Sequence, residues 1–390
     1  MQLSESISRI SVSPTAAVVM KADRLKASGV DLVDFGAGEP DFPTPENIKR
    51  AAFRALEKDF TKYTATGGIR ELKAAIAERH ARDFGSNYTA EECLVTVGGK
   101  QAIFEAVVAT INAGDEVILP VPYWVSFLDI IHYAGGQAVL VRTREEENFA
   151  LRAFEVEKHL TAKTRMIVVN SPNNPTGSVV GPEEMEKLLA LAIRHDVLLL
   201  SDECYCHFLY DGRKPFSLGA SKEREHLVIT GSFSKTYAMT GWRVGFALGP
   251  QKLLSSMVKL QSHSTSNPTA FAQHGALEAL RGPQDSVARM LAEYGRRRER
   301  IVEGLRAIPG VRSTKPEGAF YAYPNISAYL NKDGVTDATV LAEKLLEIAQ
   351  VAVVPGPAFG TEDHVRISYA ASLEQIDEGL RRMKDFLVKL

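Results

Sequence analysis

The chain has 390 residues, of which 45% are hydrophobic and 24% charged, with 46 basic and 48 acidic side chains. One hydrophobic core rarely serves such a length, so we expect about two domains. The composition is that of an average soluble folded protein and excludes a disordered or collagen-like chain. A net charge of −2 provides no overall field to attract nucleic acid or anionic lipid, so neither is an expected partner.

The N-terminus and the cysteines favour a cytoplasmic protein. Residues 1–13 mix polar and isolated apolar residues and lack the apolar core of a secretory signal. No apolar run approaches the roughly 20 residues that cross a bilayer. Cys93, Cys204 and Cys206 are too few for a disulfide framework, and no second pair accompanies Cys204-x-Cys206, so we expect reduced thiols rather than a metal site.

The first predicted elements lie on either side of a loop rich in glycine and proline. Helical periodicity over 16–28 is followed by a short strand at 31–35. Residues 36–43 hold too much glycine and proline for regular structure, and a helix follows over 46–58.

From there the chain alternates short apolar runs with helical stretches. Strands are predicted at 94–97, 116–119, 138–141, 166–169, 197–200, 227–230 and 244–248, and helices at 101–112, 124–133, 182–195 and 251–260. Continuous apolar runs joined by helices are typical of a parallel sheet that is buried on both faces. The pattern therefore predicts an α/β domain with a mostly parallel sheet between helix layers.

The pattern changes after residue 268. A long helical region runs through 307, followed by strands near 318–323, 351–354 and 365–369 and a last amphipathic helix, which predicts a smaller α+β domain. We assign 46–285 to a large cofactor-binding domain, 13–45 and 286–390 to the small domain, and 1–12 to an N-terminal arm. No flexible linker is visible, so a continuous helix is expected to join the domains.

Polar residues follow four of the predicted strands, where ligands of an open parallel sheet bind. These segments are 98–101, 170–177, 201–205 and 231–235. The Gly98-Gly99-Lys100 turn is no ATP-binding P-loop, because Leu94 and Gln101 occupy the positions of its first glycine and of its magnesium-binding hydroxyl. Gly36-x-Gly38 lacks the third glycine of a dinucleotide site, so neither segment has the usual sequence motif for binding ATP or NAD.

Lys235 is the remaining candidate for chemistry, with Ser232 and Ser234 just before it and Arg243 eight residues after. Hydroxyls, a helix N-terminus and a guanidinium can bind a phosphate while the amine forms a Schiff base with an aldehyde. Pyridoxal 5'-phosphate carries both groups. Four further residues suit its ring: Asp202 for the pyridine nitrogen, Tyr205 and Asn174 for the phenolic oxygen, and Trp124 for stacking.

A series of motifs in this order resembles the class I aminotransferases, and most closely their bacterial aspartate/prephenate subgroup. The motifs are Gly38-Glu39-Pro40-Asp41, Thr61-Lys62-Tyr63, residues 95–101, Pro122-Tyr123-Trp124, residues 170–177, residues 201–205, the Lys235 segment and residues 364–369. The resemblance covers nearly the whole chain and implies the pyridoxal-phosphate aspartate aminotransferase fold.

The resemblance also implies roles for individual residues. Lys235 would form the Schiff base and move the substrate proton, with Asp202 and Tyr205 as its catalytic partners. The phosphate would be bound by Ser232, Ser234, Arg243 and the amides of Gly99 and Lys100. The substrate would be bound by Gly38, Lys100, Trp124, Asn174 and Arg366, and Arg366 would bind its α-carboxylate. Tyr63 would reach the phosphate of a partner subunit, so a homodimer is implied.

The substrate follows from a departure within the family. Other aspartate aminotransferases place an arginine in the stretch that matches 261–268, which holds none here, and in the bacterial subgroup Lys100 would bind the distal carboxylate. Ser11 stands where the subgroup usually has a lysine, which weakens prephenate as a substrate more than aspartate. We therefore expect amino transfer between aspartate or glutamate and 2-oxoglutarate or oxaloacetate.

Other interpretations remain open. An aromatic or prephenate aminotransferase and a pyridoxal-phosphate lyase would share most of these residues. A transcription regulator with an aminotransferase-like domain would need a DNA-binding module ahead of the fold, for which the residues before 16 leave no room. Singly, Lys235 could be a solvated lysine, Asp202 a helix N-cap, Tyr63 and Trp124 half-buried aromatics, and Arg366 part of a solvated strand face.

Overall fold

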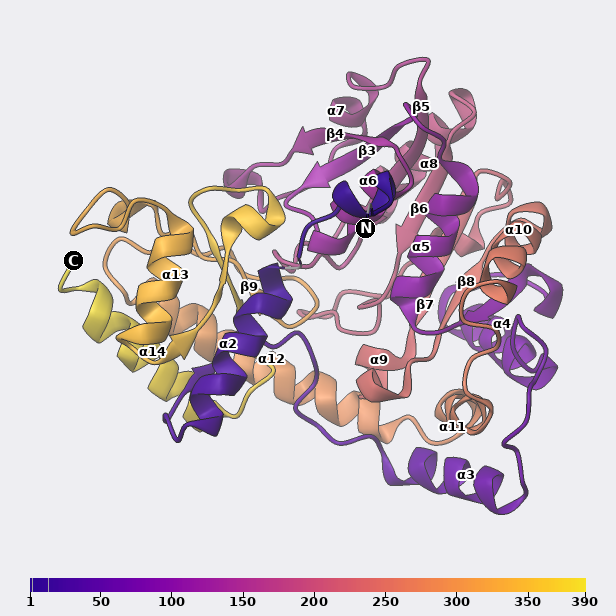
Figure 1. Ribbon diagram of the computed structural model, residues 1–390, viewed down its shortest axis with the longest axis horizontal. Helices are drawn as coiled ribbons and strands as arrows, with labels where there is room; N and C mark the ends of the chain where they lie inside the picture. The colour runs from indigo at the N-terminus through magenta and orange to yellow at the C-terminus, as the bar shows by residue number, and fades with distance from the viewer. Residues whose placement is uncertain (2, 13) are drawn as a thin grey trace.

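A seven-stranded sheet forms the centre of the larger part of the protein (Figure 1). The computed structural model describes residues 1, 3–12 and 14–390. The strands are β2 (Cys93–Thr96), β3 (Glu116–Val121), β4 (Gln137–Arg142), β5 (Thr164–Asn170), β6 (Leu198–Asp202), β7 (Leu227–Ser232) and β8 (Gly245–Leu248), in the order β2-β8-β7-β6-β5-β3-β4. β4, β3, β5, β6 and β7 are parallel, and β8 is antiparallel to both of its neighbours. The predicted mostly parallel sheet is confirmed.

Helices cover both faces of this sheet. Residues of α5 (Gly99–Thr110), α6 (Val125–Tyr133) and α10 (Gln251–Ser262) belong to one buried cluster, and those of α4 (Arg70–Phe84), α7 (Ala153–Glu157), α8 (Pro182–Arg194) and α11 (Ala270–Arg281) to another. Neighbouring strand residues alternate between the clusters, as Leu199 and Leu200 do. Such runs are apolar throughout because side chains of both orientations are buried. α3 (Glu46–Glu57) packs on α11.

A smaller group of elements lies beside the large sheet, on the left of Figure 1. β9 (Tyr321–Ala322), β11 (Val354–Pro355) and β12 (Val365–Ser368) form an antiparallel sheet, and β1 (Val33–Asp34) pairs in parallel with β10 (Val351–Ala352). The helices of this group are α2 (Pro14–Ala27), α12 (Asp285–Arg306), α13 (Ala338–Glu347) and α14 (Leu373–Leu387). Two short helices lie outside this group: α1 (Glu5–Ser8) contacts α6, and α9 (Phe233–Thr236) follows β7. The β1–β10 pairing brings the two ends of the chain into this group.

The long helical region predicted between residues 268 and 307 is two helices. α11 ends at Arg281 and α12 begins at Asp285, with Gly282 and Pro283 between them. Proline lacks the amide hydrogen of a helix interior, and glycine favours helix ends, so the break follows from the residues themselves. Residue 13, where the small domain was predicted to begin, lies outside the described residues, and the domain boundaries stay predictions. No described helix is long and apolar enough to cross a membrane.

Candidate active site

A cavity of about 450 Å³ lies where the large sheet meets the smaller group of elements. Twelve of the thirteen predicted site residues line it: Gly38, Gly99, Lys100, Trp124, Asn174, Asp202, Tyr205, Ser232, Ser234, Lys235, Arg243 and Arg366. The thirteenth, Tyr63, does not line this cavity and is 90% exposed in the single chain. The carboxyl ends of β5, β6 and β7 therefore meet at one site, as the parallel order requires.

Lys235 lies on α9, the short helix that follows β7. Ser232 caps this helix, and its hydroxyl accepts a hydrogen bond from the amide of Ser234. The Lys235 amine donates to the carbonyl oxygen of Gly38, so its partner is neutral. Burial lowers the pKa of Lys235, because it disfavours the charged ammonium. A buried amine with a lowered pKa is suited to act as a nucleophile and as a base.

Asp202 is a buried carboxyl group at the end of β6, and 6% of the residue is exposed. It accepts hydrogen bonds from Asn170 Nδ2 at 3.0 Å and from the amide of Cys204 at 3.2 Å. No helix begins directly after Asp202, where residues 204–207 form turns, so the alternative role as a helix N-cap is wrong. Burial raises the pKa of Asp202 to about 7, and no cation of the described residues forms an ion pair with it. The carboxyl group faces the cavity and lacks a positive partner.

Four groups that bind anions converge at the start of α5. Gly98 has φ +82°, and a Cβ atom there would lie 2.4 Å from Nη2 of Arg243, so the guanidinium packs directly on this glycine. Gly99 and Lys100 occupy the first two helical positions, where amides have no acceptor within the helix. With the hydroxyls of Ser232 and Ser234 beside them, these amides form a site of the kind that holds phosphate.

Arg366 lies on β12 and is 2% exposed. Its two terminal nitrogens donate to Asn174 Oδ1 at 3.1 Å and to the carbonyl oxygen of Gly36 at 2.8 Å. Its guanidinium lies 4.7 Å from the centre of the Tyr321 ring. Within the described part of the chain no carboxylate pairs with Arg366, and its Nε has no hydrogen-bond partner. A buried cation with only neutral acceptors is suited to bind an anionic ligand.

Lys100 is exposed at the rim of the cavity, with its Nζ 5.0 Å from the centre of the Trp124 ring. Although the residue as a whole is exposed, the protein atoms around its amine partly desolvate it, and this desolvation and the charge of Arg243 lower the pKa of Lys100. It forms no ion pair among residues 1, 3–12 and 14–390. Besides Arg243 at the phosphate site, the cavity thus holds two cations without a carboxylate partner among the described residues, Arg366 and Lys100, which lie on different elements.

Several lining residues were not predicted from the sequence: Val19, Ala37, Glu39, Ile103, Asn170, Cys204, Thr240 and Tyr321. Tyr321 is the most consequential of them, because its hydroxyl lies 2.8 Å from that of Tyr205 and its ring contacts Arg366. It belongs to a strand of two residues, which is too short to show a periodic pattern. Asn170 supports Asp202 and could have been found from its place at the end of β5.

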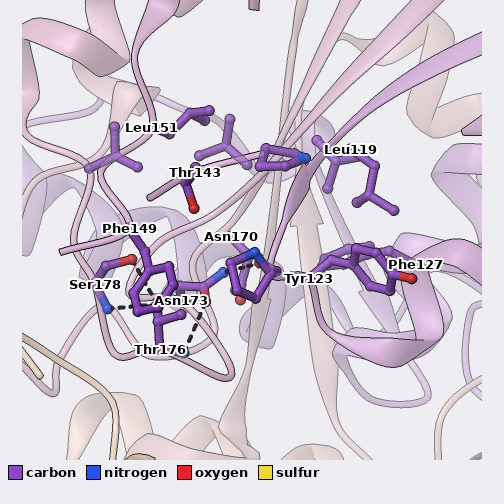
Figure 2. A pocket seen from close by; sticks show the side chains of 15 residues that line it. Leu119, Tyr123, Phe127, Thr143, Phe149, Leu151, Asn170, Asn173, Thr176 and Ser178 are labelled. Carbon is purple, nitrogen blue, oxygen red and sulfur yellow. Dashed lines mark hydrogen bonds between the residues drawn. The ribbon is translucent and has the colours of Figure 1, made fainter. Parts of the chain in front are cut away.

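A smaller cavity of about 30 Å³ lies behind the loop that carries Asn174 (Figure 2). Asn173, Thr176 and Ser178 line it and hydrogen-bond to one another, and most of the other lining residues are apolar. The space suits about two water molecules. No lysine, arginine, histidine, cysteine or carboxylate lines it, so the larger cavity is the candidate active site.

Comparisons with known proteins place these residues in a family. The model of the family described as aminotransferase class I and II matches residues 30–383. An aspartate aminotransferase of Bacillus sp. (strain YM-2) is 41% identical over 387 residues, covering 99% of each chain. An aspartate/prephenate aminotransferase of Thermus thermophilus is 45% identical over 383 residues, covering 97% of each. The solved Thermus thermophilus aspartate aminotransferase with maleate superposes with a TM-score of 0.95 at 44% identity, covering 99% of this chain and all of that one.

Proposed function

The chain belongs to the class I and II aminotransferases, and from this we propose that it moves the amino group of aspartate or glutamate to 2-oxoglutarate or oxaloacetate. One observation carries the choice of substrate. Once Arg243 is assigned to the phosphate, Arg366 and Lys100 are two further cations at the cavity that lack carboxylate partners among the described residues. A dicarboxylic amino acid supplies two carboxylates, one for each.

The enzyme depends on pyridoxal 5'-phosphate, as its family does. When bound, this cofactor supplies an aldehyde for linkage to an amine and a ring that withdraws electrons from the reacting carbon. The residues present fit it: the start of α5, Ser232, Ser234 and Arg243 suit the phosphate, and Asp202 suits a protonated ring nitrogen. The buried carboxyl group without a cation supports this fit, because a positive ring nitrogen would favour its ionised form.

The remaining contacts to the ring come from three elements. Trp124, at the start of α6, Tyr205 and Asn174 line the cavity. Trp124 would cover the ring, and Tyr205 and Asn174 would donate to its phenolic oxygen. Tyr321 holds the Tyr205 hydroxyl through the contact at 2.8 Å. We assign Tyr321 to orienting Tyr205.

Substrate binding uses residues from both groups of elements. Arg366, from the small sheet, holds the α-carboxylate through two parallel N–H donors, assisted by Asn174 and Gly38. Lys100, from the large sheet side, binds the distal carboxylate. Lys235 Nζ then removes the proton from the substrate Cα, for which a lowered amine pKa is favourable.

We also propose a cytoplasmic homodimer. Tyr63 is 90% exposed, and Phe53 and Phe60, which precede it in the chain, are 63% and 45% exposed. A second copy that covers these side chains would bring Tyr63 to the partner's phosphate site. The three cysteines are free thiols, which supports a reducing compartment.

Prephenate is the second candidate acceptor, because several relatives are named aspartate/prephenate aminotransferases. Ser11 does not line the cavity; its amide and hydroxyl donate to Asp129 at 3.0 and 3.2 Å. Ser11 thus brings no cation to the cavity, and the preference for aspartate over prephenate rests on the sequence departure alone.

A substrate panel tests the proposal. Protein loaded with cofactor is incubated with aspartate, glutamate, phenylalanine or alanine and 2-oxoglutarate or oxaloacetate, and with glutamate and prephenate, and the products are quantified. We expect the aspartate–2-oxoglutarate pair to have the highest kcat/KM. Ammonia in place of amino transfer would indicate a lyase, and a protein inactive with aspartate would refute the substrate.

A further inference from the structure

Glu145 joins the large sheet to the small one. It follows β4, and its side chain is 14% exposed. Its Oε2 accepts from Asn325 Nδ2 at 2.9 Å and pairs with Arg312 Nη2 at 3.1 Å, and His364 Nε2 lies 3.6 Å away. All three partners belong to the part of the chain that forms the small sheet. Nothing in the proposed chemistry uses this carboxylate.

The loop that carries Glu145 has a strained backbone. Asn148 and Phe149 have φ +53° and +54°, a region that a bulky side chain such as that of phenylalanine rarely adopts. The Phe149 ring packs edge-on against Tyr323 and His364, with ring centres 5.9 and 5.6 Å apart. The same ring lines the small cavity of Figure 2, which leaves space on its large-sheet side. Contacts to the small sheet therefore help to hold this loop, and strain of this kind accumulates at functional positions.

The partners of Glu145 lead directly to Arg366. Asn325 forms isolated β-bridges with both Arg312 and His364. His364 lies two residues before Arg366, immediately before β12 begins. Burial lowers the pKa of His364, although the carboxylates of Asp363 and Glu145 both face this imidazole. Arg312 is the cation closest to Glu145. Displacement of Glu145 would release the strand end from which Arg366 projects.

We propose that Glu145 is a positioning residue for substrate binding: it fixes β12, and with it Arg366, relative to Lys235 across the two sheets. This inference rests on the proposed function, because it assigns Arg366 to the substrate α-carboxylate. Lys235 and the residues of the phosphate site lie on the large-sheet side, and none of them contacts Glu145 in the described structure. Loss of the contact should therefore weaken substrate binding more than it slows the chemistry.

The test compares Glu145→Gln with Glu146→Gln in the cofactor-loaded enzyme. Both changes remove one negative charge from the same loop, but Glu146 is exposed and has no side-chain partner among the described residues. For Glu145→Gln we expect the KM for aspartate to rise about tenfold, the scale of one charged hydrogen bond, with kcat within about twofold of the wild type. Hydrogen exchange should become faster in 143–149 and in 364–368, and stay unchanged in α8.

Two outcomes would overturn the proposal. Equal KM values and equal exchange in the two variants would show that Glu145 positions nothing. A parallel fall in kcat and in cofactor content, together with a lower melting temperature, would show a merely structural role. A wild-type enzyme without aspartate turnover would instead refute the proposed function, and the exchange measurement would still report on the Glu145 contact.

Discussion

Substitution of Lys100 tests the substrate assignment most directly, because the residue touches the distal carboxylate in the proposal and little else. Its amine lies 5.0 Å from the centre of the Trp124 ring and forms no ion pair in the described ranges. Removal of one partner of a buried charged pair costs about 2–5 kcal/mol. The exposed rim position argues against the top of that range, so we expect Lys100→Ala to lose about 2–4 kcal/mol in aspartate kcat/KM. That loss corresponds to about 30- to 900-fold.

The assay uses two substrates and one conservative variant. Steady-state kcat/KM for aspartate and for phenylalanine is measured with 2-oxoglutarate held constant, in the wild type, Lys100→Ala and Lys100→Arg. Phenylalanine lacks the distal carboxylate, so its kcat/KM should change by less than about threefold, under 1 kcal/mol. Lys100→Arg retains the charge and should recover part of the aspartate activity. Equal losses for both substrates would show that Lys100 acts on the cofactor phosphate or on the start of α5.

Three further predictions concern the cofactor site. Borohydride reduction of the loaded protein followed by peptide mapping should label Lys235, and Lys235→Ala should lose the label and essentially all turnover; a label on another lysine would refute the assignment. In the cofactor-free protein the pKa of Asp202 is raised to about 7, so the folded state holds a proton that the unfolded chain has released, and stability falls as the pH rises from about 4 to about 7. Asn cannot lose a proton, so between about pH 4 and pH 7 the urea-unfolding free energy of Asp202→Asn should rise relative to that of the wild type by on the order of 3–4 kcal/mol. Transamination by the loaded variant should slow about 100- to 1,000-fold. A pH-independent difference in stability would contradict the burial of a free carboxyl group. Gly98→Ala should weaken cofactor binding, because its Cβ would meet Arg243. Gly85 has a similar φ of +76° with open space around it, so Gly85→Ala should lower only stability. Equal cofactor affinity in the two variants would contradict the proposed phosphate site.

The sequence predicted those parts of the structure that depend on local patterns of apolar and polar residues. Runs of four apolar residues bounded by polar turns predicted the strands of the large sheet, because both faces of that sheet are buried. Parallel order then brings the ends of β5, β6 and β7 together, which is why Asn174, Asp202 and Lys235 could be predicted at one site. The resemblance to a family added Arg366, which no local pattern identifies.

Contacts between distant parts of the chain could not be predicted in this way. Arg366 donates to Asn174 and to Gly36, which lie 192 and 330 residues away along the chain. The exposed strand face considered for Arg366 is wrong, because the residue is buried between sheets that meet only in the folded chain. The aromatic cluster around Tyr294 and Phe320 takes in Phe208, which follows β6, so packing is continuous across the predicted domain boundaries. Those boundaries stay predictions for that reason.

The charges of the site show that this fold does not maximise the stability of the free protein. Asp202 and Arg366 are both buried at the same cavity and could pair as carboxylate and guanidinium, but neither forms an ion pair with the other or with another described residue. An unpaired buried charge is unfavourable by several kcal/mol, and pairing the two would be the simplest remedy. Their separation is explained if each awaits a different partner, a cationic ring nitrogen for Asp202 and a carboxylate for Arg366. Ligands that supply these partners bind the folded state alone, so binding at this site also stabilises the fold.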